Sequence, residues 1–406
     1  MPHSIPALIT PEVMRWARLQ AGLHDINVAA SRIGRSPEEI AAWEAGTKAP
    51  SLAQARKAAE VYRRSLAVFY LPEPPKGFQT MRDYRQHAGS QSVYFSPELT
   101  FLIRTIENKQ AWMTEWAKNE GAAQIPYIGA ASLDKPATEV AGAIRIALGI
   151  KVADQIACTT RREALNLWIE KAEAIGINVC RQGEIDCNEA RGFVLTDAYA
   201  PFVFINSSDA IVAQLFTLAH ELAHLWLNAP GLSNLEGIGR GNDDDEAKIE
   251  VFCNSVAAYT LLEDSALKEL WAKAAGAKDL GDRIARVSNV LKISEEVIAR
   301  RLLEQNKISL KDYQSLREYF AERWRQYKRE EKVRMRSRKG GPSPHLLRVL
   351  LNGRIFTRTV LSSFFEGTLP GADASRLLSV KVNNFPKVAE HAGLIPGRRY
   401  PLRREL

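Results

Sequence analysis

The sequence has few cysteines and no long apolar run. Its four cysteines, in a chain of 406 residues, have the spacing neither of a disulfide framework nor of a zinc ribbon. Reduced thiols of this kind are typical of the cytoplasm. No stretch of roughly 18 apolar residues is present, and the amino terminus MPHSIPALITPE lacks the charged and apolar regions of a signal peptide. We therefore expect a cytoplasmic protein without a membrane segment.

The chain contains enough apolar material for more than one core. Hydrophobic residues make up 46% of it, and its length predicts two to four domains. The net charge of +8 and the pI near 9.2 permit an anionic partner such as nucleic acid. Much of this positive charge is local, so charge alone identifies no partner.

Residues 207–230 carry a pattern whose spacing predicts chemistry. Apolar residues recur there at helical spacing, which indicates a mostly buried helix. His220 and His224, four residues apart, share one helix face and can hold one metal ion, while Glu221 can reach a water on that ion. This spacing is typical of zinc proteases. Two incidental core histidines are the alternative, but three buried polar side chains would then need other partners. The candidate boundaries are Ser207, Ser208 or Asp209 at the start and Pro230-Gly231 at the end.

A third ligand is needed, and the next helical stretch offers one. Glu250 lies among apolar residues, 26 residues beyond His224. Burying an unpaired carboxylate is costly, whereas burying a metal ligand is not. The alternative is that Glu250 faces solvent and that Glu246 or an aspartate of the acidic loop before it is the ligand. Asn254, one turn after Glu250, is a candidate to orient a ligand or bind substrate.

At this point the chain resembles the ImmA/IrrE-type metallopeptidases. The matching residues are Phe216-Thr217-Leu218-Ala219 before His220-Glu221-Leu222-Ala223-His224, then Glu250, Cys253-Asn254 and Ala257-Ala258, and upstream Arg191-Gly192-Phe193 and Pro201 to Asn206. The family usually has Ala-Asn and Leu-Met-Pro where this chain has Cys253-Asn254 and Leu261-Leu262-Glu263. The resemblance covers roughly residues 1 to 335.

The resemblance implies a zinc-dependent endopeptidase with a protein substrate, such as a DNA-binding repressor or an antitoxin-like partner. Zn²⁺ would be held by His220, His224 and Glu250, with Glu221 as the general base. No stabiliser of the oxyanion can be singled out, and Asn254 and Tyr259 are candidates. The alternative is a DNA-binding transcriptional regulator or toxin–antitoxin component whose metallopeptidase fold binds a partner without cleaving it.

Residues 10–70 predict a small helical domain that resembles the helix-turn-helix of Xre-type repressors. Gly34 supplies a turn, and Ser36-Pro37-Glu38-Glu39 predicts a capped helix start. Glu38 and Glu39 stand where base-contacting residues are expected, and carboxylates repel phosphate. Basic residues that can still hold the DNA backbone are Arg32, Arg35, Lys48, Arg56 and Lys57. Sequence-specific DNA binding therefore stays open beside dimerisation or partner docking, and a homodimer is a possible assembly.

The remaining chain predicts helices around a small sheet. Amphipathic or helical patterns cover residues 97–120, 137–148, 160–175 and 263–330, and three short β-rich runs cover residues 177–180, 192–195 and 202–205. Basic residues cluster from Arg323 to Lys339, which we interpret as a solvated helix end leading to a linker rather than a binding strip. An apolar tail with a basic end follows.

These patterns predict an α+β, predominantly helical protein with a zincin-like core and a sheet of about three strands. The expected division is a helix-turn-helix domain at 1–75, a helical connector at 76–130, the peptidase core at 131–265, a helical extension at 266–340 and a small carboxy-terminal domain at 341–406.

Overall fold

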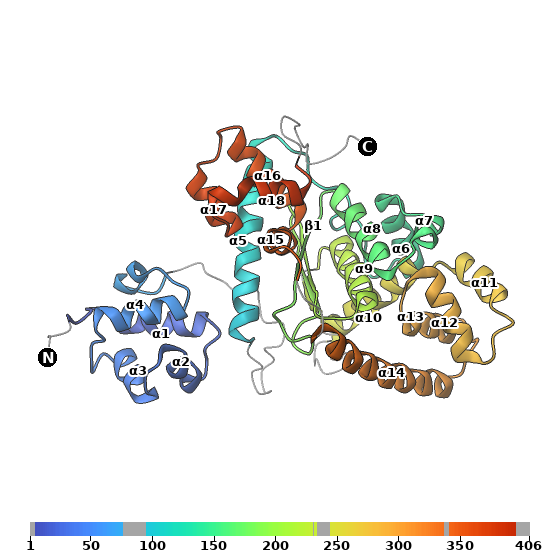
Figure 1. Cartoon of the computed structure of the whole chain (residues 1–406), viewed down its shortest axis with the longest axis horizontal. Helices are drawn as coiled ribbons and strands as arrows, with labels where there is room; N and C mark the ends of the chain where they lie inside the picture. Colours follow the sequence, from blue (N-terminus) through green and yellow to red (C-terminus); the bar gives the residue numbers. More distant parts are fainter. Residues whose placement is uncertain (1–4, 76–94, 230, 234–243, 337–340, 395–406) are drawn as a thin grey trace. The chain divides into compact units, whose positions relative to one another are not determined.

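The chain folds into two compact units, residues 1–108 and 109–406. The computed structural model describes residues 5–75, 95–229, 231–233, 244–336 and 341–394, and for residues 231–233, 244–246, 324 and 326–336 it describes the backbone alone. Figure 1 shows the elements of both units. Helices predominate, which confirms the α+β, mostly helical class predicted from the sequence. Within the described residues no helix is long and apolar enough to span a membrane.

The first unit consists of short helices. Its elements are α1 (Pro11–Gln20), α2 (Ile26–Ile33), α3 (Pro37–Glu44), α4 (Leu52–Val61), the 3-10 helix η1 (Leu66–Tyr70) and the start of α5 (Pro97–Asn119). Ser36 caps α3 by accepting a hydrogen bond from the backbone N–H of Glu39, as its sequence predicts. Gly34 closes α2 in the left-handed conformation with φ +76°, which glycine adopts without strain.

The core of this unit is aromatic and is closed by one buried ion pair. Trp43, Tyr62 and Phe69 are almost fully buried. Arg18 of α1 donates two hydrogen bonds to the carboxylate of Glu44 at the end of α3, at 2.7 and 2.9 Å. Because both side chains are nearly buried, this bidentate pair fixes the position of α3 against α1.

The second unit surrounds a small sheet with helices. Its helices are α6 (Ala137–Leu148), α7 (Val152–Ala157), α8 (Arg161–Ala174), α9 (Ile211–Leu227), α10 (Asp244–Leu261), α11 (Asp264–Lys273), α12 (Leu280–Leu291), α13 (Glu295–Glu304), α14 (Leu310–Arg336), α15 (Pro344–Asn352), α16 (Arg354–Phe365), α17 (Gly371–Leu378), η2 (Val382–Asn384) and α18 (Phe385–Ala392). Its strands are β1 (Asn178–Gln182), β2 (Gly192–Leu195), β3 (Phe202–Asn206) and β4 (Gly231–Ser233).

The sheet is mixed and has the strand order β1-β3-β2-β4. β1 and β3 are parallel, whereas β2 pairs antiparallel with both β3 and β4. Three of these strands match the predicted runs, and β4 is an addition to the predicted three. The segment Gly231-Leu232-Ser233 is too short to show an alternating pattern, so its pairing with β2 was not predictable from its own residues.

Helix α9 lies against the sheet, and α10 packs against α9 (Figure 1). The apolar side of α9 meets β2 and β3, while α6 and α8 complete the same core. α9 therefore has apolar packing around most of its circumference. A polar side chain on such a helix must find its partners inside the protein.

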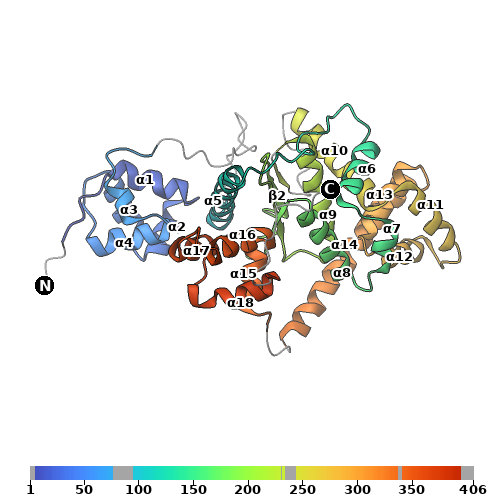
Figure 2. The same cartoon turned by 90° about the horizontal axis from the view of Figure 1, so that it is seen from above.

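The carboxy-terminal helices α15, α16, α17 and α18 form one cluster, drawn in red in Figures 1 and 2. The turn between α15 and α16 lies on β1. A Cβ at Gly353 would stand 3.3 Å from the carbonyl oxygen of Val179, and Gly353 has φ +83°. Glycine is therefore needed at this close approach, and the cluster covers the outer edge of β1.

Two features singled out in the sequence lie outside what is described. The Met81-Arg82-Asp83-Tyr84-Arg85 motif belongs to residues 76–94, and most side chains of the basic segment from Arg323 to Lys339 are not described. The interpretation of that basic segment stays a prediction, as does the five-part division of the chain.

Candidate metal centre

The turn after β3 positions the start of α9. The buried amide of Asn206 donates hydrogen bonds of 2.9 Å to the carbonyl oxygens of Ile185 and Ala190. Its oxygen accepts from the hydroxyl of Ser208 at 2.7 Å. This network fixes the chain between the last residue of β3 and the first turn of α9.

The boundaries predicted for this helix are wrong at both ends. The N-cap is Ala210, and neither Ser207 nor Ser208 nor Asp209 caps α9 with a side chain. Instead, the Gln214 amide folds back and donates to the carbonyl oxygen of Asp209 at 2.8 Å. The helix ends at Leu227 with Asn228 in the left-handed conformation, before Pro230. An amide from inside the helix thus takes over the local hydrogen bonding expected of a cap.

The structure brings His220, His224 and Glu250 to one point. The Nε2 atoms of the two histidines are 3.0 Å apart. One carboxylate oxygen of Glu250 lies 3.3 Å from Nε2 of His220, and the other lies 3.3 Å from Nε2 of His224. One ligand atom from each residue lies within 4.8 Å of the others, so the three side chains converge as a metal site requires.

The spacing of these atoms fits a tetrahedral zinc ion. Zinc binds imidazole nitrogen and carboxylate oxygen at about 2.0–2.1 Å, so two ligands of a tetrahedral site stand about 3.3 Å apart. The observed separations of 3.0, 3.3 and 3.3 Å are those of one face of such a tetrahedron. Two histidines and one carboxylate are also a donor set found in zinc enzymes, which leaves a fourth position for another ligand.

Hydrogen bonding orients one of the two imidazoles. Nδ1 of His224 lies 3.0 Å from the carbonyl oxygen of Ala229, just beyond the end of α9. A carbonyl only accepts, so Nδ1 carries the proton and Nε2 presents its lone pair toward His220 and Glu250. Such a contact fixes both the tautomer and the ring orientation of a metal-binding histidine. His220 and His224 are 0% and 2% exposed, so water does not compete for their nitrogens.

Glu250 comes from α10, the neighbouring helix. Burial opposes ionisation of this carboxyl group, but hydrogen bonds and positive charge from His220 and His224 hold its pKa well below its usual range. Glu250 is therefore an anion in this site. The alternative ligands in the acidic loop have no described side chains, and Glu250 is the carboxylate that joins the two histidines in the described part of the chain.

Glu221 is fully buried and lies against β2. One of its carboxylate oxygens is 3.1 Å from the position that a Cβ at Gly192 would occupy. The same Cβ would stand 2.4 Å from Thr217 and 2.8 Å from the carbonyl oxygen of Phe204. Gly192 is thus required because α9 and β3 approach the backbone of β2 too closely for any side chain. The sequence showed this glycine but not the reason for it.

Asn254 is 1% exposed and follows Glu250 by one turn on α10. Neither its amide oxygen nor its amide nitrogen has a hydrogen-bond partner among the described residues. Buried amides normally have partners, so this one fits a role toward a bound water or substrate. Cys253 beside it is buried, and burial raises the pKa of its thiol. The cysteine therefore stays protonated at neutral pH.

Tyr259 is placed away from this centre. Residues 250 and 259 are nine positions apart in α10, which puts their side chains on opposite faces of the helix. The Tyr259 ring stacks under the guanidinium of Arg301, with 3.4 Å between the guanidinium carbon and the ring centroid. Tyr259 therefore packs α10 against α13, and it is dropped as a candidate for stabilising an oxyanion.

In the first unit, two of the three basic residues singled out for DNA already have acidic partners. Arg32 bonds the carboxylate of Glu98 at 2.9 Å, and Lys48 lies 3.6 Å from the carboxylate of Glu39. All three basic side chains, including Arg35, are exposed. Exposed ion pairs of this kind are weak, so they do not prevent contact with phosphate.

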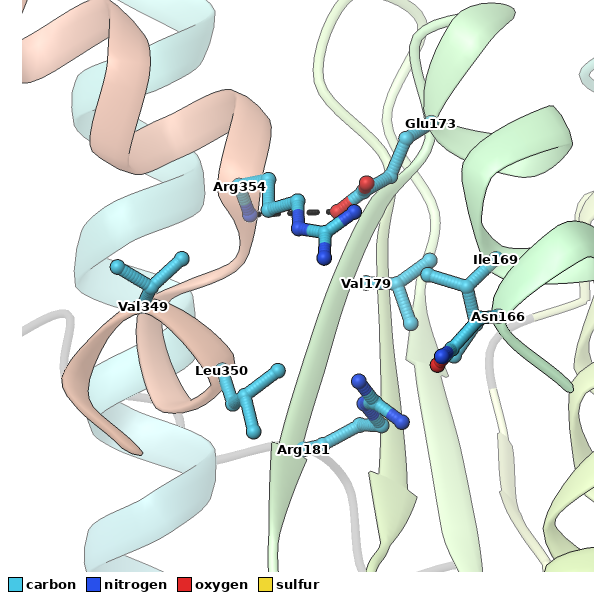
Figure 3. A pocket seen from close by; sticks show the side chains of 8 residues that line it. All are labelled: Asn166, Ile169, Glu173, Val179, Arg181, Val349, Leu350 and Arg354. Atoms are coloured by element: carbon cyan, nitrogen blue, oxygen red, sulfur yellow. Dashed lines mark hydrogen bonds between the residues drawn. The ribbon is translucent and has the colours of Figure 1, made fainter. Parts of the chain in front are cut away.

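A small pocket lies apart from the metal centre, where α15 and α16 meet α8 and β1 (Figure 3). In it the backbone N–H of Arg354 donates to the carboxylate of Glu173 at 3.2 Å. Burial raises the pKa of Glu173 to about 7, although the positive charges of Arg354, Arg358 and Arg181 oppose this rise. The pocket has no described metal-binding cluster and takes no part in the chemistry above.

A small mixed sheet followed by a helix with two histidines, and a second helix that supplies a carboxylate, defines a metallopeptidase-like domain. The comparison with protein families is more specific. Residues 172–303 match the IrrE N-terminal-like domain, and residues 14–69 match the helix-turn-helix family. The chain thus joins an amino-terminal helix-turn-helix to an ImmA/IrrE-type peptidase domain. No curated protein matches the chain.

Proposed function

We propose that this chain is a zinc-dependent endopeptidase that cleaves a regulatory protein. The observation that carries the proposal is the convergence of His220, His224 and Glu250 at tetrahedral spacing, with Glu221 next in sequence to one of the ligands. When bound, zinc supplies Lewis acidity, which polarises a peptide carbonyl and lowers the pKa of water.

The protein's own residues supply positioning and proton transfer. His220, His224 and Glu250 hold the ion, and the Ala229 carbonyl keeps His224 in the correct tautomer. Glu221 takes the proton from the attacking water and delivers it to the leaving nitrogen of the substrate. Its burial among α9 and β2 supports this role, because a carboxylate held by packing keeps its orientation. Asn254 hydrogen-bonds the substrate through its unpartnered amide.

The substrate binds in an extended conformation in this proposal. β4 is the outer strand of the sheet on the side of β2, and it follows α9 within a few residues. A peptide can pair with such an edge through its backbone, so the sequence of the cleaved protein is read by side-chain contacts elsewhere. The helix-turn-helix in the same chain supports a substrate that acts at DNA, such as a repressor or an antitoxin-like protein.

A comparison of cleavage products in the native host tests this proposal. Wild type and Glu221→Gln are expressed at equal levels, and newly formed protein amino termini are labelled and identified. We expect one or a few termini that appear with the wild type and are reduced at least a hundredfold with Glu221→Gln, because the variant lacks the general base.

Zinc content provides the control for this comparison. Glu221→Gln removes no ligand, so the variant is expected to keep its zinc and its melting temperature. Identical sets of new termini in cells with wild type and with Glu221→Gln would instead favour a fold that binds its partner without cutting it.

A further inference from the structure

The three-helix arrangement of the first unit recurs in the carboxy-terminal cluster. α1 ends at Gln20 and α16 ends at Phe365, 345 residues later. α2 spans Ile26–Ile33 and α17 spans Gly371–Leu378, again 345 residues apart at both ends. α3 begins at Pro37, and the third helix of the cluster, η2 continued by α18, begins at Val382 at the same distance. The two regions therefore align over three helices without an insertion or deletion.

The backbone of the two turns agrees as well. Between the first and second helices, Gly22 and Gly367 have φ values of +71° and +78°. After the second helix, Gly34 and Ser379 both adopt the left-handed conformation, with φ values of +76° and +52°. The next residue in each turn donates to a carbonyl five positions back. These bonds are Arg35 N–H to Ala30 at 2.9 Å and Val380 N–H to Ser375 at 3.2 Å.

The buried positions follow the same register. Four pairs separated by 345 residues are buried in both regions, two on the second helix and two on the third. They are Ala29 and Ala374, Ile33 and Leu378, Ile40 and Phe385, and Trp43 and Val388. A short helix, a left-handed residue, two more residues and a third helix, packed through these positions, form a helix-turn-helix. The region from 356 to 389 is therefore a second such unit, outside the residues that match the helix-turn-helix family.

The exposed faces of the two third helices differ. Glu38, Glu39, Ala41 and Ala42 of α3 correspond to Asn383, Asn384, Pro386 and Lys387 of the carboxy-terminal unit. Asn383, Pro386, Lys387 and Glu390 are exposed and recur at helical spacing, opposite the buried Phe385, Val388, Ala389 and Ala392. The second unit thus has amide and ammonium groups where the first has two carboxylates.

We propose that this second helix-turn-helix binds duplex DNA through the face formed by Lys381, Asn383, Asn384 and Lys387. Asparagine pairs with adenine and lysine with guanine in the major groove, and the first residues of the third helix are the ones that reach base edges. Charge supports the same partner. Residues 341–406 contain ten Lys or Arg against four Asp or Glu, and such an excess favours phosphate.

Binding of the full-length chain to random-sequence duplex DNA tests this inference. Fluorescence anisotropy over a range of salt concentrations compares wild type with Lys387→Glu. We expect affinity to fall about tenfold or more, and the slope of log affinity against log salt to become shallower by about one contact. Selection from the random pool with Asn383→Ala is expected to enrich different sequences from those that the wild type enriches.

Two variants serve as controls. Lys268→Glu reverses an exposed charge on α11, and Arg35→Glu does so on the first helix-turn-helix. Circular dichroism and melting temperature show that each variant is folded. An equal loss with Lys387→Glu and Lys268→Glu would overturn the proposal, as would unchanged binding of Lys387→Glu together with lost binding of Arg35→Glu. The exposed face would then be left to a protein partner.

Discussion

The metal centre and the amino-terminal helix-turn-helix use polar residues in opposite ways. In the metal centre, His220, Glu221 and His224 are buried, and each one demands a partner. In the helix-turn-helix, the buried positions of α3 are the apolar Ile40 and Trp43, and the polar residues face solvent. Burial makes the chemistry of the first region legible, because a buried polar group is costly unless it has a role. Exposed residues carry no such constraint.

The two regions should also fail independently, since they belong to different compact units. Damage to the aromatic core of the first unit should leave the metal centre intact. Damage beside the metal centre should leave the first unit folded. Three substitutions, from the largest expected effect to the smallest, test this separation.

Trp43→Ala should unfold the first unit. Trp43 is 1% exposed, and truncating a buried tryptophan costs about 3–5 kcal/mol. Calorimetry should show an early unfolding transition that the wild type lacks, while the zinc content and the remaining transition stay unchanged. Loss of zinc together with the first unit would show that the two regions are coupled.

Gly192→Ala should damage the metal centre instead. The added methyl group meets Thr217 and the Phe204 carbonyl oxygen at impossible distances and displaces the Glu221 carboxylate, so we expect about 2 kcal/mol of destabilisation in the second unit. Cleavage should fall more than zinc binding. Gly142→Ala on α6 is the matched control, because its Cβ meets nothing within 4 Å. If both variants behave like the wild type, the close packing of α9 on β2 does not constrain the site.

Glu173→Gln should change how stability depends on pH. The folded pKa of about 7 is above the value of 4.5 expected in the unfolded chain, so the neutral carboxyl group favours folding at low pH. This contribution is lost as pH rises from about 4.5 through 7. Because Glu173 is partly exposed, we expect the wild type to lose about 1 kcal/mol relative to the variant between pH 5 and 8.

Denaturant titrations of both proteins at several pH values measure this difference. Glu170→Gln, on the exposed side of α8, is the control and should leave the pH dependence unchanged. A pH dependence that is identical in wild type and Glu173→Gln would contradict the assignment.

Much of the fold followed from local patterns. Helix α6 and strand β2 have the predicted bounds, because one begins after proline and ends at glycine and the other is a short β-rich run beginning at a glycine. The start of α9 was predicted wrongly because Gln214, inside the helix, makes the local hydrogen bonds expected of a cap. β4 was missed because three residues show no periodicity.

The candidate site was predictable to the extent that its residues are buried. Two histidines, a glutamate and a second carboxylate on neighbouring apolar helices left few alternatives. The position of Tyr259 depends on Arg301, some 40 residues away in sequence, and no local pattern contains that contact. The second helix-turn-helix was missed for a related reason. Gly22 and Ala29 are the two residues of α1 to α3 that recur unchanged, as Gly367 and Ala374, so the repeat exists in backbone and burial alone.

The most direct test of the metal centre is the zinc content of three purified proteins, measured by elemental analysis after dialysis. The wild type and Glu246→Ala should each hold one zinc ion per chain. Glu250→Ala should bind zinc more than about a hundredfold more weakly and emerge without it, because it lacks a ligand that the site requires. Full zinc occupancy in Glu250→Ala, or its loss in Glu246→Ala, would contradict the ligand set proposed for this protein.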